Sequence, residues 1–363
     1  MNILFIEPRY HTNQIQWIKK LYSEGHDVQM FVSNKGVIED YSIIEPVLYE
    51  PCKLSKFINF FFKKRNINNS RNFPNPIKFF SDIRKLKVDI IVVRDITKPM
   101  SFLGALIGRI LTKKIIIYSQ TNIYKKYSLK RRLVISLLLN SLKAKWISPL
   151  IGDKNKYSFK PKKMYFVPFA VKIEKNSNNY KNYEPINIIT IGKFEKRKNH
   201  LLLLEALSKI NHNYNLLIIG EVSNDFHQVE LAKINNFIFK HNLSAKVTIK
   251  TNIPYSNIKK YYHKSNLFIL PSTREPASIS VIEALGFGLP VICSNTNGTR
   301  FYIKENETGL TFIDNSVNDL EKKIKFLLNT DNIQFMTKNI NDDMFPIYNS
   351  NNFYECFTKL MNN

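Results

Sequence analysis

The sequence predicts an α/β protein made of two doubly wound, Rossmann-like domains. Short apolar runs such as Ile3 to Ile6 and Ile186 to Ile191 are each followed by a polar turn and a helical pattern, which is typical of parallel strands joined by helices. The chain has 363 residues, enough for two domains of ordinary size. We place the first domain at residues 1–172, a polar linker rich in Asn and Lys at 173–185, the second domain at 186–340, and a C-terminal helical segment at 341–363.

The first strand–helix–strand unit indicates where a ligand would approach the first domain. The strand Ile3 to Ile6, an amphipathic helix that ends near Ser23 and the strand Val28 to Val32 form a parallel βαβ unit. Ligands of open α/β sheets bind beyond the carboxyl ends of the strands. We therefore expect the loop residues to lie at a cleft, with an ordinary surface position as the alternative for the histidine: Arg9, His11, Asn13 and Gln14.

Further apolar runs extend this first sheet. They lie at residues 88–94, 115–118, 146–148 and 164–167. Asp95 ends the first of them, and Ser119, Gln120 and Thr121 follow the second. Because parallel strands end at one edge of a sheet, we expect Gln120 at the same edge as the loop that follows the first strand.

The positive charge of the chain is concentrated in its first half. The net charge is +25; residues 1–185 hold 34 Lys/Arg against 13 Asp/Glu, whereas residues 186–363 hold 20 against 16. This asymmetry predicts an anionic partner for the first domain. The Phe-rich residues 51–81 carry seven basic residues and no acidic one, which indicates either a partly buried helix or a segment that lies on an anionic membrane surface.

A second basic stretch with helical spacing lies between Lys125 and Trp146. Leu129, Leu133 and Leu137 recur every four residues, with Lys130 to Arg132 between the first two. A stripe with this spacing is typical of a helix that packs on a sheet. We therefore expect these leucines to belong to the core, with a second membrane-facing segment as the alternative.

The second domain begins with a phosphate-binding pattern. The strand at 186–191 is followed by Gly192-Lys-Phe-Glu-Lys-Arg-Lys-Asn199 and by a helix that starts near His200. Helix N–H groups and ammonium charges together suit a phosphate. A solvated basic turn is the alternative for Lys193 and Lys198. Strands at 216–220, 247–249, 267–270 and 291–294 complete this domain.

Residues 271–292 carry two carboxylates beside a predicted helix start. Glu275 precedes the helix and Glu283 lies two turns inside it, so both point to one side. The free N–H groups near Ser278, Ile279 and Ser280 can hold a phosphate. Such a stretch suits a ligand in which a diphosphate is flanked by hydroxylated sugars. The alternative is that Glu275 caps the helix and Glu283 is solvated.

Composition narrows the remaining classes. Cys52, Cys293 and Cys356 are far apart in the chain, and no metal-ligand spacing occurs, so we expect a reducing cytosol and no metal site. No run of 18 apolar residues is present, and the first residues form a strand without the basic region of a signal peptide.

The run from Glu275 to Ile292 resembles the signature of the family-4 retaining glycosyltransferases, E-P-F-G-L-S-V-L-E-A-x-x-x-G-x-P-V-I. The chain departs from it at Ala277 and Ser278, where the family usually has an aromatic residue and glycine. The turn after Gly192 is similar to the family's G-R-L…K pattern, with Lys193 at the arginine position. The resemblance covers about residues 186–330.

The resemblance implies a GT-B arrangement, in which the two domains face each other across a cleft, and transfer of a sugar from a nucleotide-sugar to an acceptor hydroxyl with retention. It implies that Glu283 holds the ribose, Glu275 the transferred sugar, and Lys193 and Lys198 the leaving diphosphate, without metal or cofactor. It also implies a nucleobase site at the turn that begins with Ile253, Gln120 in place of a frequent histidine near the sugar, and a C-terminal helix that crosses back over the first domain.

The charge of the first domain adds an acceptor class to this expectation. A glycan or lipid-linked acceptor in cell-surface polysaccharide synthesis fits an anionic partner, and it implies a cytoplasmic protein, peripheral at the inner face of the cell membrane. One alternative is a sugar-nucleotide epimerase or hydrolase, for which Glu7 and Asp95 are the evident acid/base candidates. The other is a non-enzymatic nucleic-acid binder, but no nucleic-acid motif is present and we expect no nucleic-acid partner.

Overall fold

The computed structural model describes residues 1–36, 39–61, 72–174, 184–343 and 349–362. The chain folds into two compact units. Unit 1 comprises Met1–Ala170 together with Ser350–Asn363, and unit 2 comprises Val171–Asn349. Each unit is an open parallel sheet with helices on its faces, which confirms the predicted pair of doubly wound α/β domains.

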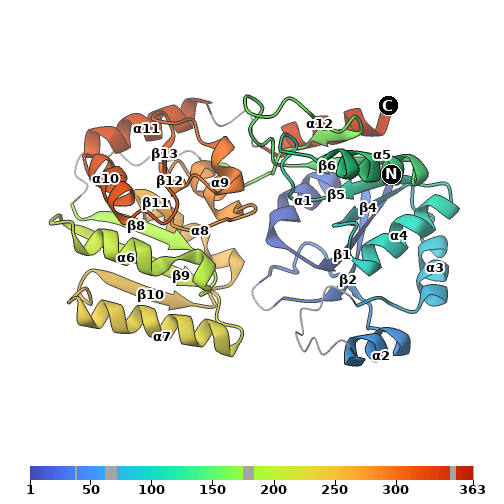
Figure 1. The fold of residues 1–363 in the computed structure, drawn as a ribbon, viewed down its shortest axis with the longest axis horizontal. Helices are drawn as coiled ribbons and strands as arrows, with labels where there is room; N and C mark the ends of the chain where they lie inside the picture. Colours follow the sequence, from blue (N-terminus) through green and yellow to red (C-terminus); the bar gives the residue numbers. More distant parts are fainter. Residues whose placement is uncertain (37–38, 62–71, 175–183, 344–348, 363) are drawn as a thin grey trace. The chain divides into compact units, whose positions relative to one another are not determined.

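Unit 1 has a seven-stranded sheet in the order β3-β2-β1-β4-β5-β6-β7 (Figure 1). Its strands are β1 Asn2–Arg9, β2 Asp27–Asn34, β3 Val47–Leu48, β4 Ile90–Arg94, β5 Lys114–Tyr118, β6 Ala144–Ser148 and β7 Met164–Phe166. Its helices are α1 Ile15–Ser23, α2 Lys53–Phe61, α3 Pro76–Lys85, α4 Pro99–Ile110, α5 Leu129–Ser141 and α12 Ser350–Asn362. The predicted strands are all present; the two-residue strand β3 was not predicted.

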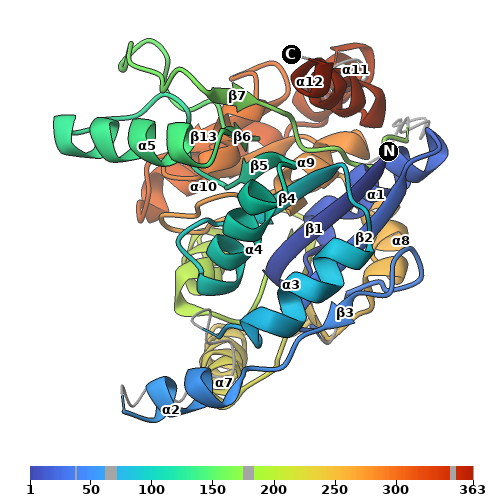
Figure 2. The same cartoon turned by 90° about the vertical axis from the view of Figure 1, so that its right-hand side faces the viewer.

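The direction of each crossover decides which face of this sheet a helix covers. The chain moves from β1 to β2 in one direction along the sheet, and from β4 through β5 to β6 in the opposite direction. Because such crossovers are right-handed, α1 covers one face and α4 and α5 cover the other. Figure 2 shows α3 and α4 in front of the strands of unit 1, with α5 to their left.

The C-terminal helix α12 packs on α1. Phe353 stacks on Trp17 with ring centroids 4.6 Å apart. Lys114 of β5 donates to the carbonyl of Met361 at 2.6 Å, and Lys145 of β6 donates to that of Leu360 at 2.5 Å. Two lysines from the sheet thus satisfy carbonyl groups that the end of a helix leaves without partners.

Unit 2 has a six-stranded sheet in the order β10-β9-β8-β11-β12-β13. Its strands are β8 Ile186–Ile191, β9 Tyr214–Gly220, β10 Val247–Thr251, β11 Leu267–Leu270, β12 Val291–Ser294 and β13 Gly309–Phe312. Its helices are α6 His200–Ser208, α7 Asp225–Lys240, α8 Lys259–His263, α9 Ile279–Gly286, α10 Val317–Leu327 and α11 Thr330–Asp343. The edge strand β13 was not among the predicted strands.

Candidate functional site

The polar residues of unit 2 gather where the sheet changes direction. Strands β8 and β11 are parallel neighbours, and from them the chain continues to β9 on one side and to β12 on the other. The loops after β8 and β11 therefore meet at the carboxyl edge, at the switch point where open α/β sheets bind ligands. These loops carry the two segments that the sequence singled out, 192–199 and 271–278.

Glu275 is the centre of this edge. It is buried, and its Oε2 accepts a hydrogen bond from Lys198 Nζ at 2.6 Å and another from Arg197. Burial lowers the pKa of Lys198, while the charge of Glu275 acts in the opposite direction. A Cβ on Gly192 would lie 3.1 Å from Cδ of Lys198, so glycine gives the lysine room to cross the end of β8.

Lys193 lies on the other side of the same turn. Its Nζ is 2.9 Å from Oε2 of Glu221, a buried carboxylate that directly follows β9. The lysine itself is partly exposed. The loop stays close to β9 because Gly220 has no side chain: a Cβ there would lie 2.4 Å from the Phe194 ring and 2.7 Å from the Gly192 carbonyl oxygen.

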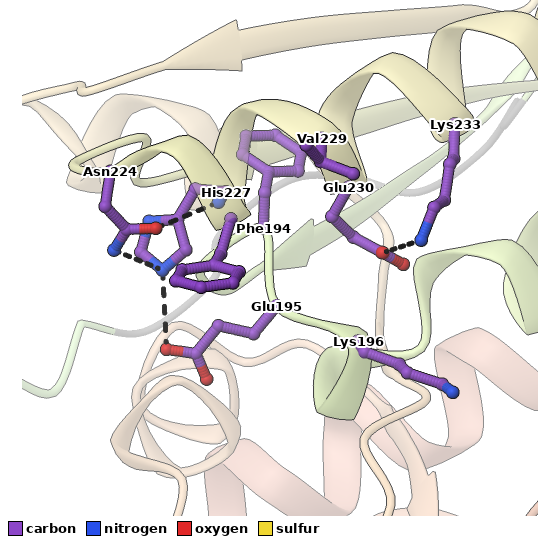
Figure 3. Close-up of a pocket in the computed structure, with 9 residues that line it drawn as sticks. Phe194, Glu195, Lys196, Asn224, His227, Val229, Glu230 and Lys233 are labelled. Carbon is purple, nitrogen blue, oxygen red and sulfur yellow. Dashed lines mark hydrogen bonds and ion pairs between the residues drawn. The ribbon is translucent and has the colours of Figure 1, made fainter.

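Arg197 connects Glu275 to a neighbouring pocket. It contacts Glu275 and also Glu195, whose Oε2 lies 3.2 Å from its Nη2. Glu195 lines a pocket of about 390 Å³, and its Oε1 lies 3.6 Å from Nε2 of His227. Figure 3 shows His227 between Asn224 and Glu195. The pocket is lined by Phe194, Glu195, Lys196, Asn224, Phe226, His227, Val229, Glu230 and Lys233.

The second signature carboxylate, Glu283, is held by two tyrosines. Tyr255 donates to Oε1 at 2.6 Å and Tyr262 donates to Oε2 at 3.1 Å. Burial raises the pKa of Glu283, and the two hydroxyl donors oppose that rise. Tyr262 also stacks on Phe287, so the same side chain packs in unit 2 and contacts the carboxylate.

The start of α9 lies between the two carboxylates in the chain. Ser278 precedes the helix, yet its side chain makes no cap hydrogen bond; its Oγ lies 2.8 Å from Oγ of Ser280. Both serines are buried, and Ile279 is partly buried. Ser278 therefore leaves the first N–H groups of α9 to other acceptors, which suits an anion.

The arrangement combines positive charge with acceptors. Lys198, Arg197 and the start of α9 offer charge and N–H donors for an anion, and Glu275 and Glu283 offer acceptors for hydroxyl groups. The alternative of a surface cap at Glu275 and a solvated Glu283 is wrong, because both carboxylates are buried. Sequence reasoning missed Arg197, Glu221 and Tyr262; only Glu221 carried a signal, its place directly after a strand.

In unit 1 the predicted loop residues divide into two groups. Asn13 and Gln14 are buried together with Glu7, Arg94 and Tyr118, at the carboxyl ends of β1, β4 and β5. Arg94 Nη1 lies 3.5 Å from Glu7 Oε2 and 3.4 Å from Asn13 Oδ1, and Asn13 Nδ2 lies 3.4 Å from the Tyr118 hydroxyl. Glu7 Oε1 and both polar atoms of the Gln14 side chain have no hydrogen-bond partner among the described residues.

Burial dominates the electrostatics of this cluster. It raises the pKa of Glu7 from 4.5 to about 7, against the opposing charge of Arg94. Of the other predicted residues, Gln120 reaches this cluster through a side-chain hydrogen bond with Tyr118. Arg9 forms an ion pair with Glu39 at 2.7 Å, His11 is partly buried, and Gln120 follows the end of β5 and is partly buried.

The two basic stretches of unit 1 expose apolar side chains. The expectation that Leu129, Leu133 and Leu137 belong to the core is wrong: all three are exposed, and Ile135 and Leu139 on the opposite side of α5 are buried. The helix has apolar residues on both sides, so spacing alone could not identify the side that packs on the sheet. In α2, Ser55 is the buried residue among those whose side chains are described; residues 62–71 of the predicted membrane segment lie outside the described part.

Among the described residues no helix is long and apolar enough to cross a membrane.

Comparisons with known proteins find similarity to glycosyltransferases. Residues 171–341 match the family model described as "Glycosyl transferases group 1". A curated relative from Campylobacter jejuni, N-acetylgalactosamine-N,N'-diacetylbacillosaminyl-diphospho-undecaprenol 4-alpha-N-acetylgalactosaminyltransferase, is 28% identical over 191 residues, which cover 50% of this chain and 49% of the relative. A GDP-Man:Man(3)GlcNAc(2)-PP-Dol alpha-1,2-mannosyltransferase from Xenopus tropicalis is 24% identical over 164 residues, 42% of this chain and 33% of the relative. The chain thus matches less than half the length of each of these relatives.

Solved structures share the fold over the whole chain. A glycosyltransferase from Rickettsia africae is 17% identical with a TM-score of 0.76, over 100% of this chain and 99% of that chain. Anabaena Alr3699/HepE, solved in complex with UDP, is 12% identical with a TM-score of 0.75, over 100% of both chains. Residues 171–341 therefore match the group 1 glycosyl transferases, and the whole chain shares the two-domain GT-B fold of the solved glycosyltransferases.

Proposed function

We propose that this chain is a family-4 type retaining glycosyltransferase that moves a sugar from a nucleotide-sugar to an acceptor hydroxyl. The observation that carries the proposal is the pair of buried carboxylates, Glu275 and Glu283, on the two sides of the α9 start, with Lys198 in contact with the first. A nucleoside diphosphate sugar has hydroxyl groups on both sides of a diphosphate. Along the chain a hydrogen-bond acceptor, an anion site and a second hydrogen-bond acceptor follow one another, which matches the order of groups in such a ligand.

In this proposal the leaving diphosphate receives most of the stabilisation. Negative charge develops on it in the transition state, and Lys193, Lys198 and the N–H groups of α9 would stabilise that charge. Ser278, Ile279 and Ser280 would supply those N–H groups, and the absence of a Cβ on Gly192 would let the backbone approach. These groups would make a metal unnecessary.

The two carboxylates would then hold the donor in place. Glu283 would hold the ribose with the carboxylate oxygens that Tyr255 and Tyr262 contact in this structure. Glu275 would hold the transferred sugar, with Lys198 between it and the phosphates. The acceptor hydroxyl would attack from the face that the diphosphate leaves, so that the anomeric configuration is retained, and positioning would supply much of the rate.

The sugar acceptor would approach unit 1. The carboxyl edge of the unit 1 sheet holds Asn13 and Gln14 beside Glu7, and the raised pKa of Glu7 keeps a proton available near neutral pH. The relatives from Campylobacter jejuni and Xenopus tropicalis are named for transfer to polyprenol-linked glycans. We extend that to this chain as a cell-envelope glycan or lipid-linked acceptor, which would place the protein at the cytoplasmic face of a membrane.

Thermal unfolding against a panel of nucleotides tests the donor site. A ligand at 100 times its dissociation constant adds about 2.7 kcal/mol to stability. We expect UDP or GDP to raise the melting temperature of the wild type and not that of Glu283→Ala or Lys198→Ala. The exposed Glu205→Ala is the matched control and should keep the shift. If no nucleoside diphosphate shifts the wild type, the donor-site proposal fails.

Product analysis separates the proposed reaction from the alternatives. With the nucleotide-sugar found in this way, NMR of the product should show transfer with the anomeric configuration of the donor, and EDTA should leave the rate unchanged. Conversion of the sugar without any acceptor would instead indicate an epimerase or a hydrolase. Inversion at the anomeric carbon would contradict the retaining assignment.

A further inference from the structure

The outer side of α5 carries an apolar stripe that the fold leaves uncovered. Leu129 is 79% exposed, Leu133 and Leu137 are each 61% exposed, and Val134 is 54% exposed. The inward side of the helix is already formed by Ile135 and Leu139, which are buried against the sheet. The exposed stripe therefore adds nothing to the core of unit 1.

Helix α4 extends this apolar surface. Phe102, Leu106 and Ile110 recur every four residues and are exposed. Helices α4 and α5 cover the same face of the sheet, and Arg109 Nε near the end of α4 donates to the carbonyl of Ser141 at the end of α5 at 3.2 Å. We call the exposed apolar residues of these two helices the α4–α5 surface. Exposed apolar side chains gathered on neighbouring helices in this way mark an interaction site.

The charge around this surface has one sign. Residues 96–152, which contain both helices, hold eleven Lys/Arg and no Asp/Glu. Lys126, Lys130 and Arg131 are exposed near the start of α5, and within the described ranges no carboxylate forms an ion pair with them. Burial, with a further contribution from Arg131, lowers the pKa of Lys125 to about 8. The apolar surface is thus bordered by positive charge without internal neutralisation.

This combination selects one class of partner. A second copy of the chain could cover the leucines, but it would bring two sets of like charges together. A nucleic acid would use the charges and leave the leucines in water. We propose that the α4–α5 surface docks on an anionic phospholipid bilayer, with its apolar side chains in the interface and its Lys and Arg residues on the headgroups.

The direction of α5 decides which edge of unit 1 would meet the headgroups. The segment before the helix lies beside the segment after β6: the Ile123 amide donates to the Leu150 carbonyl at 2.9 Å, and Tyr124 bridges to Gly152. The basic residues at the start of α5 therefore lie at the carboxyl edge of the sheet, as do Arg94 and Gln120. Docking would bring the membrane surface to the edge where the proposed acceptor approaches; only this last step rests on the proposed function.

Vesicle co-sedimentation of the full chain tests the docking surface. We expect the wild type to bind phosphatidylglycerol vesicles at low salt and not phosphatidylcholine vesicles. Each leucine that enters the interface should contribute about tenfold in affinity, so Leu133→Ser with Leu137→Ser should reduce binding about 100-fold. The matched control, Val229→Ser with Phe239→Ser on the exposed side of α7 in unit 2, should bind like the wild type.

A charge variant tests the second half of the proposal. A basic residue near an anionic surface contributes about fivefold, so Lys130→Gln with Arg131→Gln should reduce binding roughly 25-fold. Unchanged melting temperatures of all variants would show that the fold is intact. The nucleotide-induced thermal shift should also persist in the α5 variants, so a failure of docking is separable from a failure of the proposed donor site.

Several results would overturn this assignment. Equal binding of the wild type and the leucine variant would show that another surface carries the membrane contact. Absence of binding to anionic vesicles would contradict the proposal that the chain docks on an anionic membrane. A dimer in light scattering that the leucine variant abolishes, without vesicle binding, would identify a second copy of the chain as the occupant.

Discussion

Buried carboxylates at the carboxyl edges of the two sheets differ in the hydrogen bonds that they accept. In unit 2, Glu275 accepts from Lys198 and Arg197, and Glu283 accepts from two tyrosines. In unit 1, Glu7 Oε2 has a long contact to Arg94 at 3.5 Å, and its Oε1 is without a hydrogen-bond partner among the described residues. The two carboxylates at the unit 2 edge are held by hydrogen bonds in the absence of a ligand. At the unit 1 edge, Glu7 has an oxygen that is still available to accept a hydrogen bond from a ligand.

The two tryptophans allow the units to be followed separately. The chain contains two, Trp17 and Trp146, and both belong to unit 1. Tryptophan fluorescence therefore reports the unfolding of unit 1, and a calorimetric transition without a fluorescence change belongs to unit 2.

The largest effect is expected at Glu275. Glu275→Ala leaves the buried Lys198 without its counter-charge, and breaking a buried pair in this way costs about 3–5 kcal/mol. Calorimetry should show this loss in the transition that fluorescence does not follow. Glu205→Ala, which removes an exposed partner of Lys209, should change it by less than about 1 kcal/mol. Equal losses of stability in the two variants would mean that the buried Glu275–Lys198 pair stabilises unit 2 no more than an exposed ion pair does.

The next effect concerns the pH dependence of unit 1. Glu7 has an ordinary pKa of 4.5 and a folded pKa of about 7, so the folded unit keeps a proton that the unfolded chain releases between these values. The free energy of unfolding should therefore be highest below pH 4.5 with respect to this group, and should fall as the pH rises to about 7. The slope is about 1.4 kcal/mol per pH unit, roughly 3 kcal/mol in all.

Glu7→Gln should remove this pH-dependent part, since glutamine does not titrate. Urea unfolding followed by tryptophan fluorescence at pH 4.5, 6 and 8 measures the slope independently of any constant loss. Glu45→Gln, at an exposed position, should keep the wild-type slope. An unchanged slope in Glu7→Gln would show that Glu7 is ionised in the folded protein, and the contrast between the two edges would disappear.

A smaller effect is expected at Gly220. Its substitution by alanine places a Cβ 2.4 Å from the Phe194 ring, and such overpacking costs about 1–3 kcal/mol. The turn that carries Lys193 should move away from β9, so nucleotide affinity should fall as well. Asn215→Ala, at an exposed position in the same strand, should change neither quantity beyond about 0.5 kcal/mol. Full nucleotide affinity in Gly220→Ala would show that the close packing of the turn is not required.

The smallest effect is expected at Tyr255. Tyr255→Phe removes one hydrogen bond to Glu283 and leaves that of Tyr262, so unit 2 should lose about 1 kcal/mol. The freed oxygen of Glu283 can accept from a ribose, so titration calorimetry should find nucleotide affinity at least equal to that of the wild type. A clear fall in affinity would mean that the tyrosine itself contacts the nucleotide.

The same contrast explains how much could be predicted from the sequence. In unit 2, Glu275, Glu283 and the start of α9 lie within one short stretch, and the fold class follows from the alternation of strands and helices. In unit 1, Glu7, Asn13, Arg94 and Tyr118 come from segments far apart in the chain, so only the three-dimensional pairing of β1, β4 and β5 brings them together.

Other features depend on information that local patterns do not contain. The contact of the Tyr262 hydroxyl with Glu283 depends on the packing of α8 beside α9. The position of Tyr262 in the helical pattern indicates only a residue that packs in the core. Helix α5 has leucine on both sides, and only its position against the sheet determines which side is exposed. Strand β13 starts at a glycine, where a turn was the simpler prediction.

The packing of α12 in unit 1 has a consequence for synthesis of the protein. During translation the residues of unit 2 leave the ribosome before α12 does, so the sheet of unit 1 waits for Phe353 to stack on Trp17 until a complete second domain has been made. Domains otherwise tend to fold in the order of their synthesis. A graft that exchanges unit 2 between similar proteins should therefore replace residues 171–349 as an insert and leave α12 with its native unit 1.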